Sequence, residues 1–195
     1  MAPKDRLTFR AVTRDRWPDL EELFGPRGAC GGCWCMWWKL PRSEFKKGRG
    51  EGNRAALHRL VRSGRTPGLL AYRGTKPVGW VAVAPRDTFP VLQRSRNLKP
   101  LDDRPAWSAP CFFVRREERG RGISVALLEA AKEHVQRNGG ELLAGYPVCP
   151  RRKRIPDAFA WTGLVSAFRK SGFEEAARPS PTRAIMRCWI KKDEA

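Results

Sequence analysis

Apolar and polar residues recur along this chain with two different periods, which predict strands and helices. Residues 6–12 (RLTFRAV) alternate as a half-buried strand does, whereas residues 14–24 and the stretch after Asn53 carry apolar residues at helical spacing. Thr13 and Asn53 are suitable N-cap residues for these two helices. Residues 68–85 hold two apolar runs around the turn at 73–77 (RGTKP), which predicts a pair of neighbouring strands.

The second half of the chain also mixes strands and helices. Residues 106–114 (AWSAPCFFV) predict a strand, and after Gly122 the apolar residues fall on one helical face as far as Val135. Further strands are expected at 141–148, 173–180 and 182–190, and a short helix at 164–173. The expected order is therefore strand, two helices, three strands, helix, strand, helix and two strands, which is typical of an α/β protein.

The stretch Arg119-Gly120-Arg121-Gly122 forms the expected turn between the strand at 106–114 and its helix. Glycine lets a backbone approach a ligand closely, and the free N–H groups of a helix's first turn attract anions. Arg116 and the two arginines of the turn add positive charge. The turn therefore predicts an anion site, although an ordinary tight turn with solvated arginines would use the same residues.

Composition agrees with one folded domain and an anionic partner. The chain has 195 residues and 41% apolar content, which suits a single domain, residues 1–195, with a sizeable core. A net charge of +19 indicates coenzyme phosphates, an acidic acceptor or nucleic acid, while solvated surface charge is the plainer explanation. No apolar run approaches a membrane span and the N-terminus lacks a signal-peptide pattern, so we expect a cytoplasmic protein with its six cysteines mostly reduced.

The glycine turn resembles the acyl-coenzyme A motif of the GNAT (GCN-related N-acetyltransferase) superfamily. That motif has Gln or Arg, two residues, Gly, one residue, and Gly or Ala; here both glycines match and Glu117 stands at the first position. The order of elements is also similar to that of the family over nearly the whole chain. The resemblance implies an α/β fold with a mixed, mostly antiparallel central sheet, splayed central strands and flanking helices.

The resemblance further implies acetyl-coenzyme A as co-substrate and assigns residues to it. Backbone groups on the strand before the turn would pair with the pantetheine arm, namely Phe112, Phe113 and Val114. Amides of the turn and first helical residues would hold the pyrophosphate: Arg119, Gly120, Arg121, Gly122, Ile123 and Ser124. Phe112 or Phe113 would pack in the core instead, since neighbours on a strand face opposite ways.

A second segment, FRKSGFEE, resembles the family's late region, where a Tyr four residues before Gly-Phe protonates the leaving thiolate. Phe168 occupies that position here and Trp161 replaces the usual upstream Asn. Tyr146, Ser166, Thr162 or water would then supply the proton, and a structural hydroxyl is the alternative role for Tyr146.

An amine acceptor must lose a proton before it attacks a thioester, so a base or a water chain is expected. Asp157, in the loop IPDAFAWTG, is the first candidate, although Asp is also common in turns. The other carboxylates considered are Asp87, Asp102, Asp103 and Glu141. A base role for His58 or His134 is not favoured, because both fall on predicted helices.

The loop at about 26–50 combines cysteines with tryptophans. Cys30, Cys33 and Cys35 supply three soft ligands, but a structural zinc site needs four, and His58 or Cys149 could complete the set only through folding. We therefore expect reduced thiols and no metal. In the family this loop covers the acceptor site, which implies a pocket for an aromatic or cationic amine walled by Trp34, Trp37 and Trp38; a hydrophobic lid or homodimer contact is the alternative.

Together these features predict an acyl-coenzyme A-dependent N-acetyltransferase that uses acetyl-coenzyme A and a small amine in a ternary complex. A macromolecular acceptor, such as a charged tRNA or a protein lysine, is the first alternative, since PRRKRIP and LPRSEFKKGRGEGNR could track phosphates. A non-catalytic nucleic-acid-binding module with a cysteine metal knuckle is the second.

Overall fold

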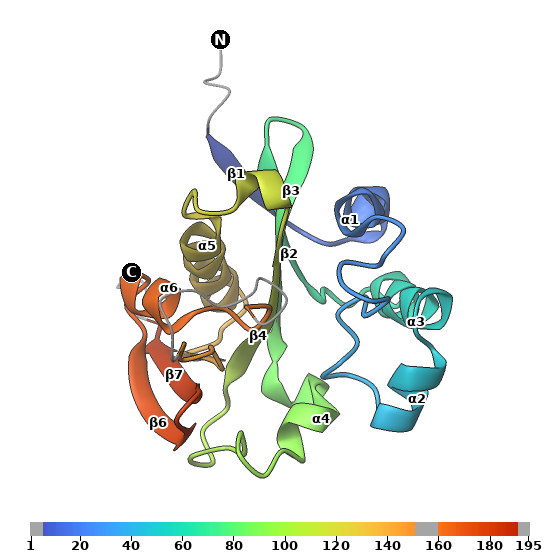
Figure 1. Ribbon diagram of the computed structural model, residues 1–195. Helices are drawn as coiled ribbons and strands as arrows, with labels where there is room; N and C mark the ends of the chain where they lie inside the picture. Colours follow the sequence, from blue (N-terminus) through green and yellow to red (C-terminus); the bar gives the residue numbers. More distant parts are fainter. Residues whose placement is uncertain (1–5, 151–159, 191–195) are drawn as a thin grey trace.

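A single mixed sheet forms the centre of the protein (Figure 1). The computed structural model describes residues 6–150 and 160–190. Its seven strands have the order β1-β2-β3-β4-β5-β7-β6. Only β4 and β5 run parallel, and all other neighbours are antiparallel, so the predicted sheet is confirmed. The strands are β1 (Leu7–Ala11), β2 (Gly68–Arg73), β3 (Lys76–Pro85), β4 (Trp107–Val114), β5 (Leu142–Gly145), β6 (Glu174–Ser180) and β7 (Arg183–Trp189).

Helices cover both faces of the sheet. Helices α1, α2 and α3 lie on one face, and α5 and α6 lie on the other (Figure 1). Within the described ranges no helix is long and apolar enough to cross a membrane. The α-helices are α1 (Trp17–Phe24), α2 (Arg42–Lys47), α3 (Glu51–Arg62), α4 (Pro90–Gln93), α5 (Ile123–Arg137) and α6 (Val165–Lys170), and the 3-10 turns are η1 (Arg14–Arg16), η2 (Arg86–Thr88) and η3 (Arg116–Glu118).

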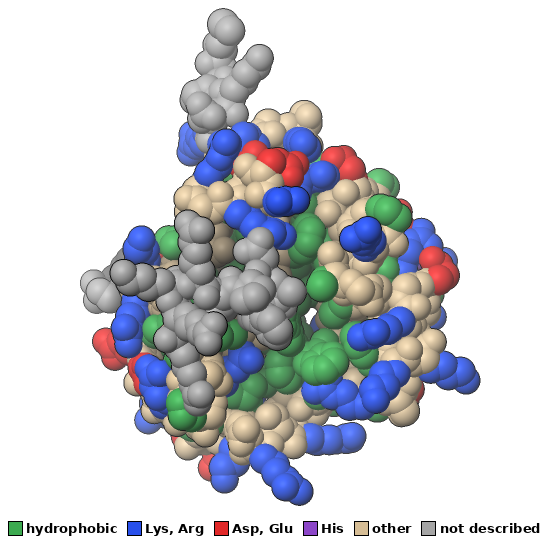
Figure 2. Space-filling model, viewed as in Figure 1, with side chains coloured by type: hydrophobic (Ala, Val, Ile, Leu, Met, Phe, Trp, Pro, Cys, Tyr) green, Lys and Arg blue, Asp and Glu red, His purple; other side chains and the backbone are tan. Residues whose placement is uncertain are grey.

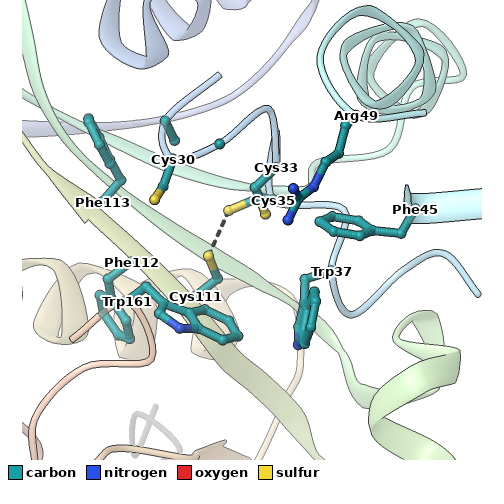
Figure 3. Close-up of a pocket in the computed structure, with 12 residues that line it drawn as sticks. Cys30, Cys33, Cys35, Trp37, Phe45, Arg49, Cys111, Phe112, Phe113 and Trp161 are labelled. Carbon is teal, nitrogen blue, oxygen red and sulfur yellow. Dashed lines mark hydrogen bonds between the residues drawn. The ribbon is translucent and has the colours of Figure 1, made fainter. Parts of the chain in front are cut away.

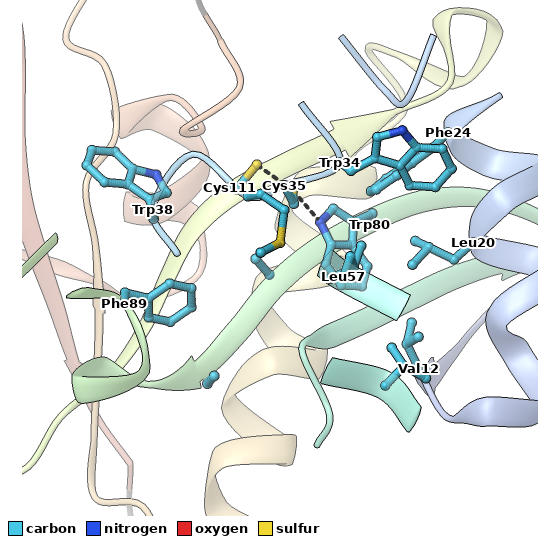
Figure 4. Close-up of a cluster of buried hydrophobic side chains, with 14 of the residues drawn as sticks. Val12, Leu20, Phe24, Trp34, Cys35, Trp38, Leu57, Trp80, Phe89 and Cys111 are labelled. Carbon is cyan, nitrogen blue, oxygen red and sulfur yellow. Dashed lines mark hydrogen bonds between the residues drawn. The ribbon is translucent and has the colours of Figure 1, made fainter. Parts of the chain in front are cut away.

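Each face of the sheet packs its own apolar cluster. Strand β3 is buried at every position from Pro77 to Ala84, as expected for a central strand with helices on both sides. On the α5 face, Leu127 and Leu128 are fully buried, and each contributes about 1.5–3 kcal/mol by leaving water. On the α1 face, tryptophans and cysteines from the loop after α1 join the cluster around Trp80 (Figure 4).

The two parallel strands diverge in the middle of the sheet. Strand β4 pairs with β5 only from Trp107 to Ala109, and β5 ends at Gly145 while β4 continues to Val114. Beyond the divergence the segment from Trp161 to Leu164 lies next to β4, because the amide of Phe112 donates to the carbonyl of Trp161 at 2.7 Å. The central strands are therefore splayed, as predicted.

Thr13 stands at the predicted N-cap position but its side chain does not cap, and the prediction of Asn53 as an N-cap is wrong. Thr13 precedes η1 and makes no capping hydrogen bond, and α3 begins at Glu51, two residues before Asn53. Asn53 is instead fully buried, and its Nδ2 donates to the carbonyls of Gly32 at 3.0 Å and Phe45 at 3.3 Å. Its side chain therefore ties the loop before α2 to α3, a tertiary role that local sequence does not reveal.

Candidate functional site

The turn between β4 and α5 exposes a row of backbone donors. Gly120 and Gly122 have φ angles of +76° and +77°, which favour glycine, and Gly122 is the N-cap of α5. None of the five amides from Gly120 to Ser124 donates a hydrogen bond within the described part of the chain. A Cβ built on either glycine meets no atom within 4 Å, so the space in front of the turn is open.

The open space in front of this turn is a cavity of about 370 Å³ between α5 and α6. Ser124, Gly163 and Lys170 are among the residues on its walls. An ion pair fixes the start of the turn to β2. The carboxylate of the buried Glu118 lies 3.0 Å from the guanidinium group of Arg73. Free amides, the positive end of the 15-residue helix α5 and Lys170 together suit a phosphate group. The residues present therefore fit the pyrophosphate of a coenzyme.

The edge of β4 that faces the splay offers alternate backbone groups. The amide of Phe112 points away from β3, because it donates to Trp161 on the other side. By strand alternation Val114 faces the same way, whereas the backbone of Phe113 faces β3. Of the three residues expected along the pantetheine arm, Phe112 and Val114 have the required orientation and Phe113 does not.

A second cavity lies on the α1 face of the sheet, beside the middle of β4 (Figure 3). It has a volume of about 270 Å³ and an almost wholly apolar wall. Cys111, Phe112 and Phe113 form one side, and Figure 3 shows Arg49, Phe45 and Trp37 reaching in from the other. The described lining residues are Ala29, Cys30, Gly31, Cys33, Cys35, Trp37, Phe45, Arg49, Cys111, Phe112, Phe113 and Trp161.

Of the three tryptophans expected in an acceptor pocket, only Trp37 lines this cavity. Trp34 is buried in the core, where it stacks on Trp17 with ring centroids 6.0 Å apart. Trp38 is also buried, and its Nε1 donates to the carbonyl of Pro110 at 3.2 Å. The expectation for Trp34 and Trp38 is therefore corrected: both support the loop from beneath.

Four cysteines meet at this cavity as free thiols. The sulfurs of Cys35 and Cys111 lie 2.8 Å apart, and Nε1 of Trp80 donates to Cys35 at 2.9 Å (Figure 4). Burial raises the pKa of Cys33 to about 12. The contact with Cys35, followed by burial, raises the pKa of Cys111 well above its usual range. Both thiols are therefore neutral near pH 7.

The structure also bears on the metal hypothesis. Among residues 6–150 and 160–190 no group of three or more His, Cys, Asp or Glu side chains is arranged to hold a metal ion. His58, considered as a fourth ligand, stacks on Trp17 at 4.5 Å. The expected absence of metal stays a prediction.

Tyr146 is fully buried just beyond β5 and does not line either cavity. Arg86 donates to its hydroxyl, and Ser108 lies at 2.9 Å from the same oxygen. Burial raises the pKa of Tyr146 despite the nearby Arg86. The contacts with Arg86 and Ser108 link the end of β5 to β4 and to the segment after β3. The hydroxyl of Tyr146 therefore has a structural role.

The other proton-donor candidates lie in different places. Ser166 is exposed on the wall of the cavity at the glycine turn. Thr162 is buried, and its hydroxyl accepts from Arg183 at 2.6 Å. The ring of Phe168 is fully buried against Phe112, and it fills the place where a Cβ on Gly145 would stand. Phe168 therefore occupies the splay between β4 and β5 without offering a proton.

Asp157, the first candidate base, lies outside the described residues. None of the four other carboxylates considered lines the cavity beside β4, as far as the described part shows. Asp102, for example, pairs with Arg187 at 2.7 Å. His134 packs against Trp107 on the α5 face, 5.7 Å between ring centroids.

Three residues at the cavity beside β4 were not expected from the sequence. Cys111 lies within a continuous apolar run, and Trp161 drew attention only as a replacement for Asn. Arg49 is one of 39 basic residues, and the basic stretch that contains it suggested phosphate contacts and not a cavity wall. Only the fold brings these side chains together.

A family model described as "Acetyltransferase (GNAT) family" matches residues 34–145, more than half of the chain. The chain belongs to the GNAT acetyltransferase family. The match includes β4, the glycine turn and the part of the cysteine- and tryptophan-containing loop from Trp34 onward. A comparison with curated proteins finds no match.

Solved structures share the fold of this GNAT protein. PaiA N-acetyltransferase from Thermoplasma acidophilum, in complex with coenzyme A, is 14% identical, covers 94% of this chain and 99% of its own, and has a TM-score of 0.53. YncA from Salmonella typhimurium, a putative acetyltransferase with acetyl-CoA, is 12% identical with coverages of 97% and 96% and a TM-score of 0.54. A GNAT acetyltransferase from Listeria monocytogenes is 10% identical with coverages of 97% and 98% and a TM-score of 0.57.

Proposed function

We propose that this GNAT protein transfers an acetyl group from acetyl-coenzyme A to the amine of a small molecule by direct attack in a ternary complex. The observation that carries the proposal is the position of the two cavities. One lies at the amides of Gly120–Ser124 and the other at Cys111 and Phe112, and residues of β4 line both, Val114 the first and Phe112 the second. The coenzyme A in PaiA and the acetyl-CoA in YncA, which share the fold, support the choice of co-substrate.

In this proposal the chain holds the coenzyme mainly through its backbone. Amides of the turn and the first helical residues bind the pyrophosphate, with the side chains of Arg119 and Arg121 nearby. Phe112 and Val114 pair with the pantetheine arm along the splay. The amide of Phe112 donates to the carbonyl of Trp161, so this hydrogen bond must break before the same amide can pair with the pantetheine arm. When bound, acetyl-coenzyme A supplies an acyl group activated as a thioester.

Protons must leave the attacking amine and reach the departing sulfur. For the amine we retain Asp157 as the proposed base, acting directly or through water. For the sulfur, Phe168 has no proton to give, and Tyr146 is engaged by Arg86 and Ser108. We therefore propose water as the donor, with Ser166 as the alternative in the cavity at the turn.

Replacing Tyr146 with Phe should lower stability more than turnover. The change leaves a buried guanidinium group of Arg86 without one partner, which costs about 1–3 kcal/mol. We expect the urea midpoint to fall while thiol release, measured well below the unfolding transition, falls less than tenfold. A general acid is typically worth ~100-fold or more, so a drop of that size in a stably folded variant would identify Tyr146 as the donor.

The test of the proposed function has two parts. Calorimetry with coenzyme A should show stoichiometric binding, and a panel of small amines should release free thiol from acetyl-coenzyme A in the presence of the protein. If coenzyme A does not bind, the acetyltransferase proposal is wrong. If it binds and only tRNA or protein acceptors are acetylated, the macromolecular alternative is correct.

The charge of the chain is the observation that favours that alternative. At +19 the protein attracts polyanions, and several phosphate contacts would make RNA binding fall steeply with salt. The cavity beside β4, at about 270 Å³, has room only for a small molecule or for one side chain of a larger partner.

A further inference from the structure

Arg49 is the only charged side chain among the described residues that line the cavity beside β4. Figure 3 shows its guanidinium group directed into the cavity, next to Phe45 and Cys33. Its guanidinium group makes no hydrogen bond or ion pair with any residue in ranges 6–150 and 160–190, although the backbone amide of Arg49 donates to the carbonyl of Lys46. An arginine with all its donors free over an apolar floor is suited to a planar anion such as a carboxylate.

The surroundings of Arg49 reinforce its preference for an anion. The guanidinium group of Arg42 lies 3.3 Å from the ring centroid of Trp37, and Trp37 lines the cavity. No carboxylate lines the cavity in the described part, and the thiols of Cys33 and Cys111 are neutral near pH 7. On the face shown in Figure 2, hydrophobic side chains gather in the middle and Lys and Arg surround them, while the visible acidic side chains lie further out. A polycationic acceptor would therefore meet electrostatic repulsion from the basic side chains here.

The rest of the cavity selects an apolar group of limited size. Trp37 lies edge-on to Phe45 and to Trp161, with centroids 5.2 Å and 6.1 Å apart, so aromatic walls enclose the space. A volume of about 270 Å³ corresponds to roughly nine water molecules at ~30 Å³ each. An acceptor of on the order of ten heavy atoms therefore fits this space.

The fold holds Arg49 in this position through its neighbours. The amide of Gly50 donates to the carbonyl of Gly32 at 3.1 Å, and the buried Asn53 donates to the same oxygen. These bonds join the start of α3 to the loop that carries Cys30 and Cys33. These hydrogen bonds therefore fix the backbone next to Arg49, although its side chain is exposed.

We propose that the acceptor is a small amino acid-like molecule, which carries an apolar or aromatic side chain and a carboxylate beside its amine. Arg49 binds the carboxylate, Trp37 and Phe45 contact the side chain, and the amine points toward Cys111 and Phe112 on β4. This proposal rests on the proposed function and names the substrate class of the same site. It replaces the cationic amine expected from the tryptophans of the loop.

Matched acceptors test the proposal by catalysis. L-phenylalanine and 2-phenylethylamine, and likewise L-leucine and 3-methylbutylamine, differ only in the carboxylate. We expect the carboxylate-bearing member of each pair to have a kcat/KM for thiol release at least about tenfold higher, as a charge-assisted hydrogen bond provides. In Arg49→Gln the ratio should approach one, whereas Lys47→Gln, an exposed residue of α2 outside the cavity, should leave it unchanged.

A binding measurement tests it without turnover. N-acetyl-L-phenylalanine should quench tryptophan fluorescence at a Kd at least about tenfold lower than N-acetyl-2-phenylethylamine, and only Arg49→Gln should abolish the difference. Equal affinities in the native protein, or an unchanged difference in a folded Arg49→Gln variant, would overturn the proposal. Thiol release only with amines that lack a carboxylate would also overturn it while leaving the acetyltransferase function intact. Failure of coenzyme A to bind would instead remove the proposed function, and the fluorescence result would still decide whether the cavity recognises carboxylates.

Discussion

Replacing Gly122 with Asp is expected to weaken coenzyme A binding by about 100-fold or more. Gly122 has a φ of +77° and caps α5, and its amide belongs to the five that lack a partner in the described chain. An aspartate there places a negative charge against the proposed pyrophosphate site. At a separation of about 4 Å and an effective dielectric near 20, the repulsion is about 4 kcal/mol, which exceeds the ~2.7 kcal/mol of a 100-fold change.

The protein itself should tolerate the Gly122 variant. A Cβ at this position meets no atom within 4 Å, and Asp adopts a positive φ more readily than most residues. Gly139→Asp is the matched control, because Gly139 follows the other end of α5 with a φ of +73° and equally open space. Calorimetry should show normal coenzyme A affinity for the control and a large loss for Gly122→Asp. Unchanged affinity in both folded variants would contradict the assignment of the turn.

Replacing Gly32 with Ala is expected to destabilise the protein by about 3 kcal/mol or more, at the upper end of single substitutions. Gly32 has a φ of +70°, and a Cβ there would lie 2.4 Å from the amide nitrogen of Gly50 and 3.0 Å from its Cα. Backbone atoms cannot move aside as a side chain can, so the loop and the start of α3 must separate. The bonds that Gly50 and Asn53 donate to Gly32 would then be lost.

The adjacent Gly31 provides the control for this effect. Its φ is +56°, but a Cβ on it meets nothing within 4 Å. Gly31→Ala should therefore cost only the backbone strain of about 1–2 kcal/mol. Urea unfolding of both variants measures the difference. Equal losses would mean that the contact between Gly32 and Gly50 does not brace the loop.

The order of elements could be predicted from the sequence because it depends on local periodicity. The alternation in residues 6–12, the apolar runs in 68–85 and the helical face after Gly122 appear as β1, the β2–β3 pair and α5. Short helices were missed where few residues carry the pattern: α2 has six residues and α4 has four. The N-cap predicted at Asn53 was wrong because suitability for capping is local, whereas the burial of Asn53 depends on a loop 21 residues away.

The candidate site likewise has one part that local sequence predicts and one part that depends on tertiary contacts. The glycine turn was predictable, since two glycines before a helix and after a strand form a contiguous feature whose backbone chemistry does not depend on distant residues. The cavity beside β4 was not, because its walls come from segments such as Cys35 and Cys111, which are 76 residues apart. The sequence did not distinguish among Trp34, Trp37 and Trp38 as residues of the pocket. Packing buries Trp34 and Trp38 in the core and leaves Trp37 on the cavity wall.

The sequence by itself therefore determined the succession of strands and helices, the turn with free amides and the resemblance to the GNAT family. Each of these follows from neighbouring residues and their period. Tertiary structure alone decided that Phe112 and Val114, not Phe113, face the splay, that the hydroxyl of Tyr146 is engaged by Arg86, and that Arg49 reaches into an apolar cavity. These depend on strand register and on contacts between distant segments, which are set only when the chain packs around its sheet.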